Sequence, residues 1–204
     1  MLNRLYHEMD QLSKEHNVRK METIGDAYIA VTNMEAEPDP MHAANMAKFA
    51  IAVMKAAQQT LVDAENESKG HVNIRAGIHS GPVTASVIGS KQPKYTILGD
   101  TVNTASRMES TSTAERIQCS KVAAGLIRRQ DPSINLQIRG KIAVKGKGEM
   151  TTVWVLWRDA NRSLNLADTL DLEQDLEDTM APDSTSAGLI RLASASGGEH
   201  RGRD

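Results

Sequence analysis

The sequence predicts an α+β domain with a largely antiparallel sheet. Short stretches in which polar and apolar residues alternate are separated by tight-turn residues, and longer stretches between them repeat apolar residues every three or four positions. Strands joined by hairpins and mixed with helices favour an antiparallel sheet covered by helices. The chain has 204 residues, which suits one domain of about 100–200 residues followed by a tail.

The first third of the chain is predicted to form a helix, a hairpin and a second helix. Residues 1 to about 16 repeat apolar side chains at helical spacing: Leu2, Leu5, Tyr6, Met9 and Leu12. The stretch KMETIGDAYIAV (20–31) alternates around Gly25-Asp26, a pair that favours a tight turn. A helix is expected from about Met41 to Glu65, with one apolar face formed by Ala44, Ala47, Ile51, Met54 and Leu61.

The pattern then changes to a period of two. A strand is expected from Val72 to Ile78, before the turn Ser80-Gly81-Pro82. A helix is expected to begin at Asp100, because aspartate is a good N-cap residue. The other predicted elements are strands at 83–88, 95–98, 117–120, 134–139 and 151–157 and a helix at 121–128.

The composition changes after about residue 158. The rest of the chain is rich in Asp, Glu, Ser and Gly and has no aromatic residue, so it lacks the apolar surface that would order it. We therefore expect a domain at 1–158 and a disordered acidic and Ser-rich tail at 159–204. One transient helical face is expected in this tail, formed by Leu164, Leu166, Leu170, Leu172 and Leu176.

Charge and cysteine content restrict the function. The chain has 24 basic and 26 acidic residues and a formal charge of −2, which argues against nucleic acid as a partner. A single cysteine, Cys119, suits a reducing compartment. The start of the sequence, MLNRLYHEMDQL, is interrupted by charges and is not expected to act as a signal peptide, and the sequence has no run of about eighteen apolar residues. We expect an intracellular, cytoplasmic segment without membrane contact of its own, although upstream segments of a parent protein would be free to attach it to a membrane.

Three stretches stand out together: KMETIGDAYIAV, KYTILGDTVNTASRME (94–109) and VKGKGEM (144–150). In this order and spacing they resemble the class III nucleotide cyclase catalytic domain, most closely its guanylate cyclase branch, from residue 1 to about 157. The resemblance implies a ferredoxin-like α+β fold that dimerises head to tail and forms two shared sites. It also implies conversion of a nucleoside triphosphate into its 3′,5′-cyclic monophosphate and pyrophosphate, by a homodimer or by a heterodimer with another cyclase domain.

The resemblance also assigns roles to individual residues. It makes Asp26 one of the family's two metal-binding aspartates, and hard oxygen ligands of this kind suit Mg²⁺ or Mn²⁺, two ions per site. It implies that Asn103 orients the ribose and that Arg107 stabilises charge on the α-phosphate; the two residues lie four apart and project from one helix face. Lys145 is expected to meet the terminal phosphates, with Lys147 as a less favoured substitute.

Two positions are expected to read the base. Glu22 occupies the first, where adenylate cyclases place a lysine and guanylate cyclases a glutamate. A carboxylate accepts hydrogen bonds from N1 and N2 of guanine and repels N1 of adenine, so Glu22 favours GTP. Thr96 occupies the second, where animal guanylate cyclases commonly carry cysteine. Its hydroxyl can donate to O6 of guanine or accept from N6 of adenine, so an adenylate cyclase remains an alternative.

One part of the family pattern is missing. The family's other metal aspartate lies on its first strand, in a stretch like F-x-D-I-x-G-F-T, and this chain contains no such stretch. We therefore expect a cyclase domain without its first strand and with little or no activity alone. The favoured hypothesis is a guanylate cyclase that makes cyclic GMP in intracellular signalling. The alternative is a non-catalytic regulatory partner of a complete cyclase chain, to which it supplies Glu22, Thr96, Asn103, Arg107 and Lys145.

Overall fold

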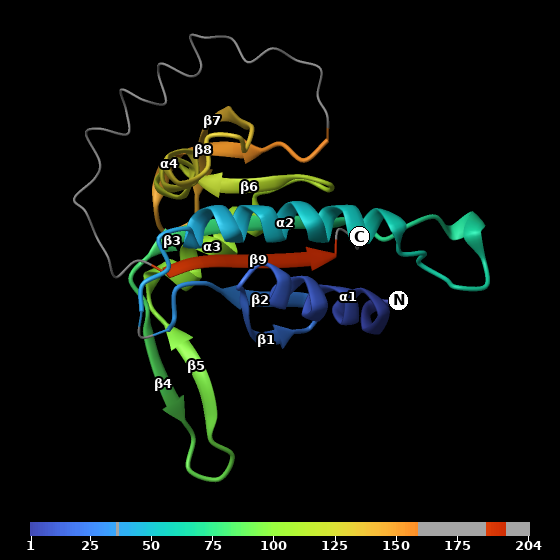
Figure 1. Ribbon diagram of the computed structural model, residues 1–204, viewed down its shortest axis with the longest axis horizontal. Coiled ribbons are helices and arrows are strands. Elements are labelled where there is room, and N and C mark those ends of the chain that lie inside the picture. Colours follow the sequence, from blue (N-terminus) through green and yellow to red (C-terminus); the bar gives the residue numbers. More distant parts are fainter. Residues whose placement is uncertain (36, 159–186, 195–204) are drawn as a thin grey trace, which may run out of the picture.

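The computed structural model describes residues 1–35, 37–158 and 187–194, and it confirms the α+β class (Figure 1). The helices are α1 (Leu2–Glu15), α2 (His42–Gln59), α3 (Asp100–Ser110) and α4 (Lys121–Gln130), with a short 3₁₀ helix at Glu67–Lys69. The strands are β1 (Arg19–Ile24), β2 (Ala27–Val31), β3 (Ile74–Gly81), β4 (Thr84–Ile88), β5 (Lys94–Leu98), β6 (Ile117–Ser120), β7 (Leu136–Val144), β8 (Gly148–Val155) and β9 (Ala187–Ser194).

The strands that the structure describes form one large sheet and one ribbon. The sheet has seven strands in the order β1-β2-β9-β3-β6-β8-β7, and β4 and β5 form the separate ribbon. All neighbours in the large sheet are antiparallel except β3 and β6, which are parallel. Figure 1 shows the β4–β5 ribbon projecting away from the sheet.

The position of β9 corrects one prediction. Residues 187–194 were expected to belong to a disordered tail, but they form a central strand between β2 and β3. Among the described residues no strand precedes α1, and β9 occupies the centre of the sheet. The reason is that AGLIRLAS, although it follows a polar stretch, places apolar residues on both of its faces. Ile190 and Leu192 join the main core, and Ala187 and Leu189 join a second cluster. The predicted face of Leu164 to Leu176 lies outside the described residues.

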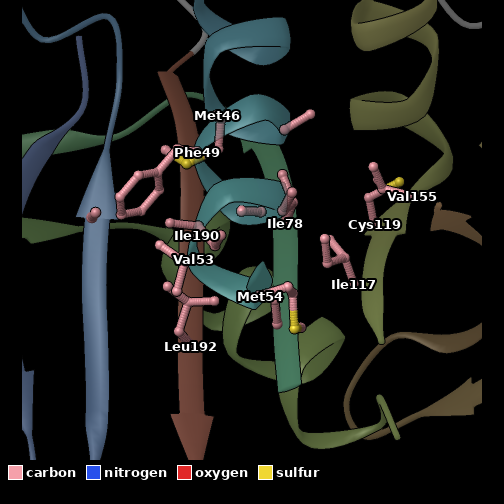
Figure 2. Close-up of a cluster of buried hydrophobic side chains, with 14 of the residues drawn as sticks. Met46, Phe49, Val53, Met54, Ile78, Ile117, Cys119, Val155, Ile190 and Leu192 are labelled. Carbon is pink, nitrogen blue, oxygen red and sulfur yellow. The ribbon is translucent and has the colours of Figure 1, made fainter. Parts of the chain in front are cut away.

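The two faces of the sheet carry different helices. The main core joins one face of the sheet to α1, α2 and α4 through residues such as Leu5, Phe49 and Ile127. Figure 2 shows Met46, Phe49, Val53 and Met54 of α2 gathered over the strands, beside Ile78, Ile190 and Leu192.

The opposite face of the sheet is covered by α3, which approaches it very closely. A Cβ built on Gly77 of β3 would lie 1.9 Å from the backbone nitrogen of Glu109. Only glycine therefore allows helix and strand to pack at this distance.

Several element boundaries differ from the predictions: β3 continues to Gly81 through the predicted turn, β7 continues to Val144 rather than 139, and β8 begins at Gly148 rather than 151. Helix α2 shows the largest difference. It ends at Gln59 rather than near Glu65, because Thr60 turns to an extended conformation (φ −90°, ψ 112°). Leu61 then forms an isolated antiparallel bridge with His71, which leads the chain toward β3. The strand at 117–120 has the predicted boundaries.

Candidate active site

The hairpin that carries Asp26 is well ordered by its strands. Ile24 pairs with Ala27, so Gly25 and Asp26 alone form the turn, and Gly25 has a φ of +62°. All five residues of β2 are buried. Asp26 is exposed at the tip of the turn. Burial raises the pKa of the nearby Tyr6 phenol, and the negative charge of Asp26 raises it further. The structure thus presents one carboxylate at the end of a rigid ribbon.

Glu22 lies in a polar cluster with β5. Its side chain is only 19% exposed and forms an ion pair with Lys94. Thr96 lies two residues beyond Lys94 in the same strand, so the two side chains project from the same face of the ribbon. The structure therefore links β1, which carries Glu22, to β5, which carries Thr96, through the ion pair of Glu22 with Lys94.

Lys94 was missed by the sequence analysis. Its partner Glu22 lies 72 residues away, and no local pattern reports such a pairing. A signal was nevertheless present, because a residue two positions before Thr96 in a strand shares its face.

Helix α3 presents Asn103 and Arg107 as predicted. The residue before the helix, Gly99, has a φ of 137°, and the helix starts at Asp100, which is its first residue rather than its cap. Asn103 is exposed and Arg107 is partly exposed. The residues of α3 that face the sheet are buried: Thr101, Thr104, Ala105, Met108 and Glu109. Asn103 and Arg107 therefore lie on the accessible side of a helix whose other side is fixed to the sheet.

The glycine–lysine stretch forms the turn between β7 and β8. Val144 pairs with Gly148, and Lys145, Gly146 and Lys147 form the turn between them. Lys147 forms an ion pair with Asp100 at the start of α3, and this hydrogen bond lowers the pKa of Asp100. Lys145, the predicted phosphate ligand, is exposed. The structure thus ties Lys147 to α3 and leaves Lys145 at the surface of the same turn.

His79 is a further polar residue near the start of α3. Its Nδ1 lies 2.7 Å from Oγ of Ser120. Burial lowers the pKa of His79 to about 4, and the negative charge of Asp100 only partly opposes this. The imidazole is therefore neutral at pH 7. The sequence analysis did not select His79, because a single histidine in a strand carries no signal of its neighbours.

The described residues contain no large cluster of metal-binding side chains. In residues 1–35, 37–158 and 187–194 there is no group of three or more His, Cys, Asp and Glu side chains placed to hold a metal ion. The strand β9, which runs beside β2, contains no acidic residue. Mg²⁺ and Mn²⁺ usually bind only one or two protein carboxylates and take their other ligands from phosphate oxygens and water. The exposed carboxylate of Asp26 is chemically suited to be one such ligand.

Within the same described residues, every helix is too short or too polar to cross a membrane.

Comparison with known proteins assigns the family. Residues 1–156 match the family described as the adenylate and guanylate cyclase catalytic domain. The chain belongs to this family, which agrees with the fold and with the polar residues gathered around β5 and α3.

Named relatives point to the guanylate branch. The chain is 37% identical over 195 residues to rat guanylyl cyclase C, covering 95% of this chain and 18% of that protein. It is 41% identical over 156 residues to rat guanylate cyclase soluble subunit beta-2, covering 76% of this chain and 22% of that protein. The chain thus spans about a fifth of the length of these relatives.

A solved structure supports the same branch. The guanylate cyclase domain of RhGC from Catenaria anguillulae, determined in complex with GTP, superposes with a TM-score of 0.69 at 40% identity. The superposition covers 78% of this chain and 82% of that domain.

Proposed function

We propose that this chain is the catalytic module of a guanylate cyclase, which converts GTP into 3′,5′-cyclic GMP and pyrophosphate as one half of a dimer. The family assignment and the guanylyl cyclase relatives support this proposal. Because the chain spans only about a fifth of those relatives, the activity, the substrate and the partners of the whole protein belong to the proposal.

One observation supports the choice of GTP: Glu22 is paired with Lys94, and Lys94 lies two residues before Thr96 on β5. The Glu22 carboxylate is mostly shielded from water and is held by Lys94. It provides acceptors for the N1 and N2 donors of guanine, whereas Lys94 and Thr96 provide donors for O6. Adenine presents an acceptor at N1 and a donor at N6, so it would face the carboxylate with the wrong group. A shielded carboxylate that faces the N1 acceptor of adenine costs more free energy than a Thr96 hydroxyl, which can rotate to donate or accept.

The residues on α3 and the β7–β8 turn fit the chemistry of ring closure. The ribose 3′-oxygen attacks the α-phosphorus and loses its proton, and the bond between the α-phosphorus and the oxygen that bridges to the β-phosphate breaks, which releases pyrophosphate. Asn103 would hold the ribose so that the 3′-oxygen faces the phosphorus. Arg107, one turn further along the same face, would stabilise the negative charge that develops on the α-phosphate oxygens. Lys145 is the proposed contact of the terminal phosphates, since Lys147 is already paired with Asp100.

Asp26 is proposed as a ligand of Mg²⁺ or Mn²⁺. When bound, such an ion supplies positive charge to the phosphates and makes the 3′-hydroxyl more acidic. Asp26 lies at the tip of a rigid hairpin, which suits a residue that must be held in place. The stretch like F-x-D-I-x-G-F-T, which carries the family's other metal aspartate, does not occur in this chain.

The β4–β5 ribbon supports a dimer. It exposes large apolar side chains at a density that is unusual for a surface: Val87 (63%), Ile88 (49%), Tyr95 (44%) and Leu98 (47%). The ribbon projects from the sheet (Figure 1) and carries Thr96 and Lys94. A second cyclase domain that covers the ribbon would therefore also border the base-reading residues, in a homodimer or a heterodimer.

The structure also favours a second candidate function, that of a non-catalytic partner. Its central strand β9 has no acidic residue, so the chain as described offers residues for the base, the ribose and the phosphates but only one carboxylate for metal. Such a chain would complete one shared site on a cyclase chain that has both aspartates.

One experiment tests both functions. The chain is mixed with a complete guanylate cyclase domain whose own arginine equivalent to Arg107 is replaced by alanine, and cyclic GMP and cyclic AMP are measured from GTP and ATP. The wild-type chain should restore cyclic GMP formation, and Arg107→Ala should abolish the restoration, a loss on the order of 10³-fold. If the chain alone converts GTP into cyclic GMP, the proposed guanylate cyclase is favoured over the non-catalytic partner. A restoration that does not depend on Arg107 would refute its proposed role.

A further inference from the structure

The central strand β9 is closely fitted to its place in the sheet. It pairs along its whole length with β3, from Ile74–Ser194 to Gly81–Ala187, and over four residue pairs with β2. A Cβ at Gly188 would lie 2.5 Å from Oγ1 of Thr32, and the Thr32 amide donates a 2.8 Å hydrogen bond to the Gly188 carbonyl. With Thr32 in place, the space between β2 and β3 therefore favours a glycine at this point, which helps to fix the register of β9.

This register places a single charged residue of β9, Arg191, against α3. Arg191 donates from Nη1 to Oγ of Ser106 at 2.8 Å. Its Nε lies 3.3 Å from Oε2 of Glu109, in an ion pair that lacks hydrogen-bond geometry. The Glu109 side chain is only 3% exposed, and its other oxygen accepts a 2.6 Å hydrogen bond from Arg75 of β3. Two guanidinium groups from neighbouring strands therefore share one buried carboxylate of α3.

The contacts of Arg191 lie on the side of α3 that packs against the sheet, next in the sequence to the residues proposed to bind the nucleotide. Ser106 is the residue directly before Arg107, and Glu109 is two residues after it. Asn103 lies one turn before Ser106 and Arg107. A small rotation or shift of α3 would therefore move both Asn103 and Arg107, and a displacement of about 1 Å at a reacting group can cost on the order of 10²-fold in rate.

We propose that Arg191 is a positioning residue for the nucleotide site, through which the C-terminal strand β9 holds α3 and thereby Asn103 and Arg107 in place. This inference rests on the proposed function for the roles of Asn103 and Arg107. It extends that function, because it makes residues 187–194, outside the part of the chain matched by the family, a component of the site. Arg75 holds Glu109 but does not contact Ser106, so Arg191 alone among the described residues bridges β9 to both positions.

The test uses the full chain and two measurements: hydrogen–deuterium exchange of the backbone amides, and calorimetric affinity for GTP in the presence of Mg²⁺. Arg191→Met retains most of the apolar stem and removes both polar contacts. The α3 amides should then exchange roughly tenfold faster while those of β2 and β3 stay protected, and GTP affinity should fall roughly tenfold. Arg191→Lys should recover part of both losses. The control, Arg19→Met, removes an exposed ion pair with Glu35 on the edge strand and should change neither measurement.

Each contrary result is informative. Unchanged exchange in α3 with Arg191→Met would overturn the proposal, and faster exchange with unchanged GTP affinity would reduce Arg191 to a structural contact. If Arg191→Met loosens the whole sheet, Ser106→Ala decides the question, because it removes only the acceptor on α3: faster exchange confined to α3 supports the proposal, and no change contradicts it. If the wild-type chain binds no GTP, the proposed function fails, while the exchange comparison still decides whether Arg191 holds α3.

Discussion

At the scale of the residue, base selection depends on Glu22. Its carboxylate is mostly shielded and is paired with Lys94, so replacing it by lysine would bring together two ammonium groups and remove the acceptor for N1 and N2 of guanine. Glu22→Lys should lower GTP affinity by at least about tenfold and raise ATP affinity relative to it. Calorimetric titration with both nucleotides measures this ratio. Glu35→Lys, at an exposed glutamate paired with Arg19, is the matched control, and an unchanged ratio in Glu22→Lys would show that Glu22 does not read the base.

His79 predicts a pH dependence of stability. Its pKa in the folded protein is about 4, lowered mainly by burial, whereas an unfolded histidine titrates near 6.5. Between these values the unfolded state binds more protons, so the free energy of unfolding should decrease as the pH falls from about 6.5 to 4. The decrease attributable to His79 is at most about 3 kcal/mol.

Urea denaturation at several pH values from 4 to 7 measures this decrease. His79→Gln cannot be protonated but can still bond to Ser120, so its curve should be flatter than that of the wild type in this window. Parallel curves would show that His79 is not the group that titrates. Asp131, with a pKa of about 2, contributes to both curves near pH 4, so its effect cancels when the variant is compared with the wild type.

At the scale of the element, β9 is tested by its contact with Thr32. Gly188→Ala places a Cβ 2.5 Å from Thr32 Oγ1 and should destabilise the fold by about 1–3 kcal/mol. Thr32→Ala removes that oxygen at the cost of its hydrogen bond to the His42 carbonyl. The double variant should therefore be more stable than the sum of the single changes predicts, by at least about 0.5 kcal/mol. Strict additivity in denaturant unfolding would contradict the position of β9 between β2 and β3.

Some elements could be predicted from the sequence alone and others could not. The hairpin around Gly25-Asp26 and the helix after Gly99 were predictable, because turn residues and apolar spacing are local signals. The strand β9 was not predictable. Its apolar residues follow a long polar segment, and the strand is stabilised by pairing with β2 and β3, which lie more than a hundred residues earlier in the chain. The apolar alternation in AGLIRLAS was the available sign.

The candidate site shows the same division. Asn103 and Arg107 share a helix face as their spacing predicted, and their roles still come from the resemblance. Lys94 and Arg191 were missed, because each acts through a partner that is distant in the sequence. Pairings of this kind are set by the sheet topology, which short-range patterns do not encode.

At the scale of the whole molecule, the residues proposed to bind nucleotide lie on one subunit and the exposed β4–β5 ribbon borders them. This arrangement suits a site that is completed by a second cyclase domain. The described residues provide the proposed groups for the base, the ribose and the phosphates. The chain should therefore bind nucleotide even under conditions in which it does not form the cyclic product.

The equilibrium affinity of the full chain for GTP and for ATP, measured by calorimetry with Mg²⁺ at concentrations that favour a dimer, decides whether the chain selects guanine. We expect GTP to bind at least about tenfold more tightly than ATP, because Glu22, Lys94 and Thr96 offer groups that complement guanine. Equal affinities, or tighter binding of ATP, would contradict this expectation.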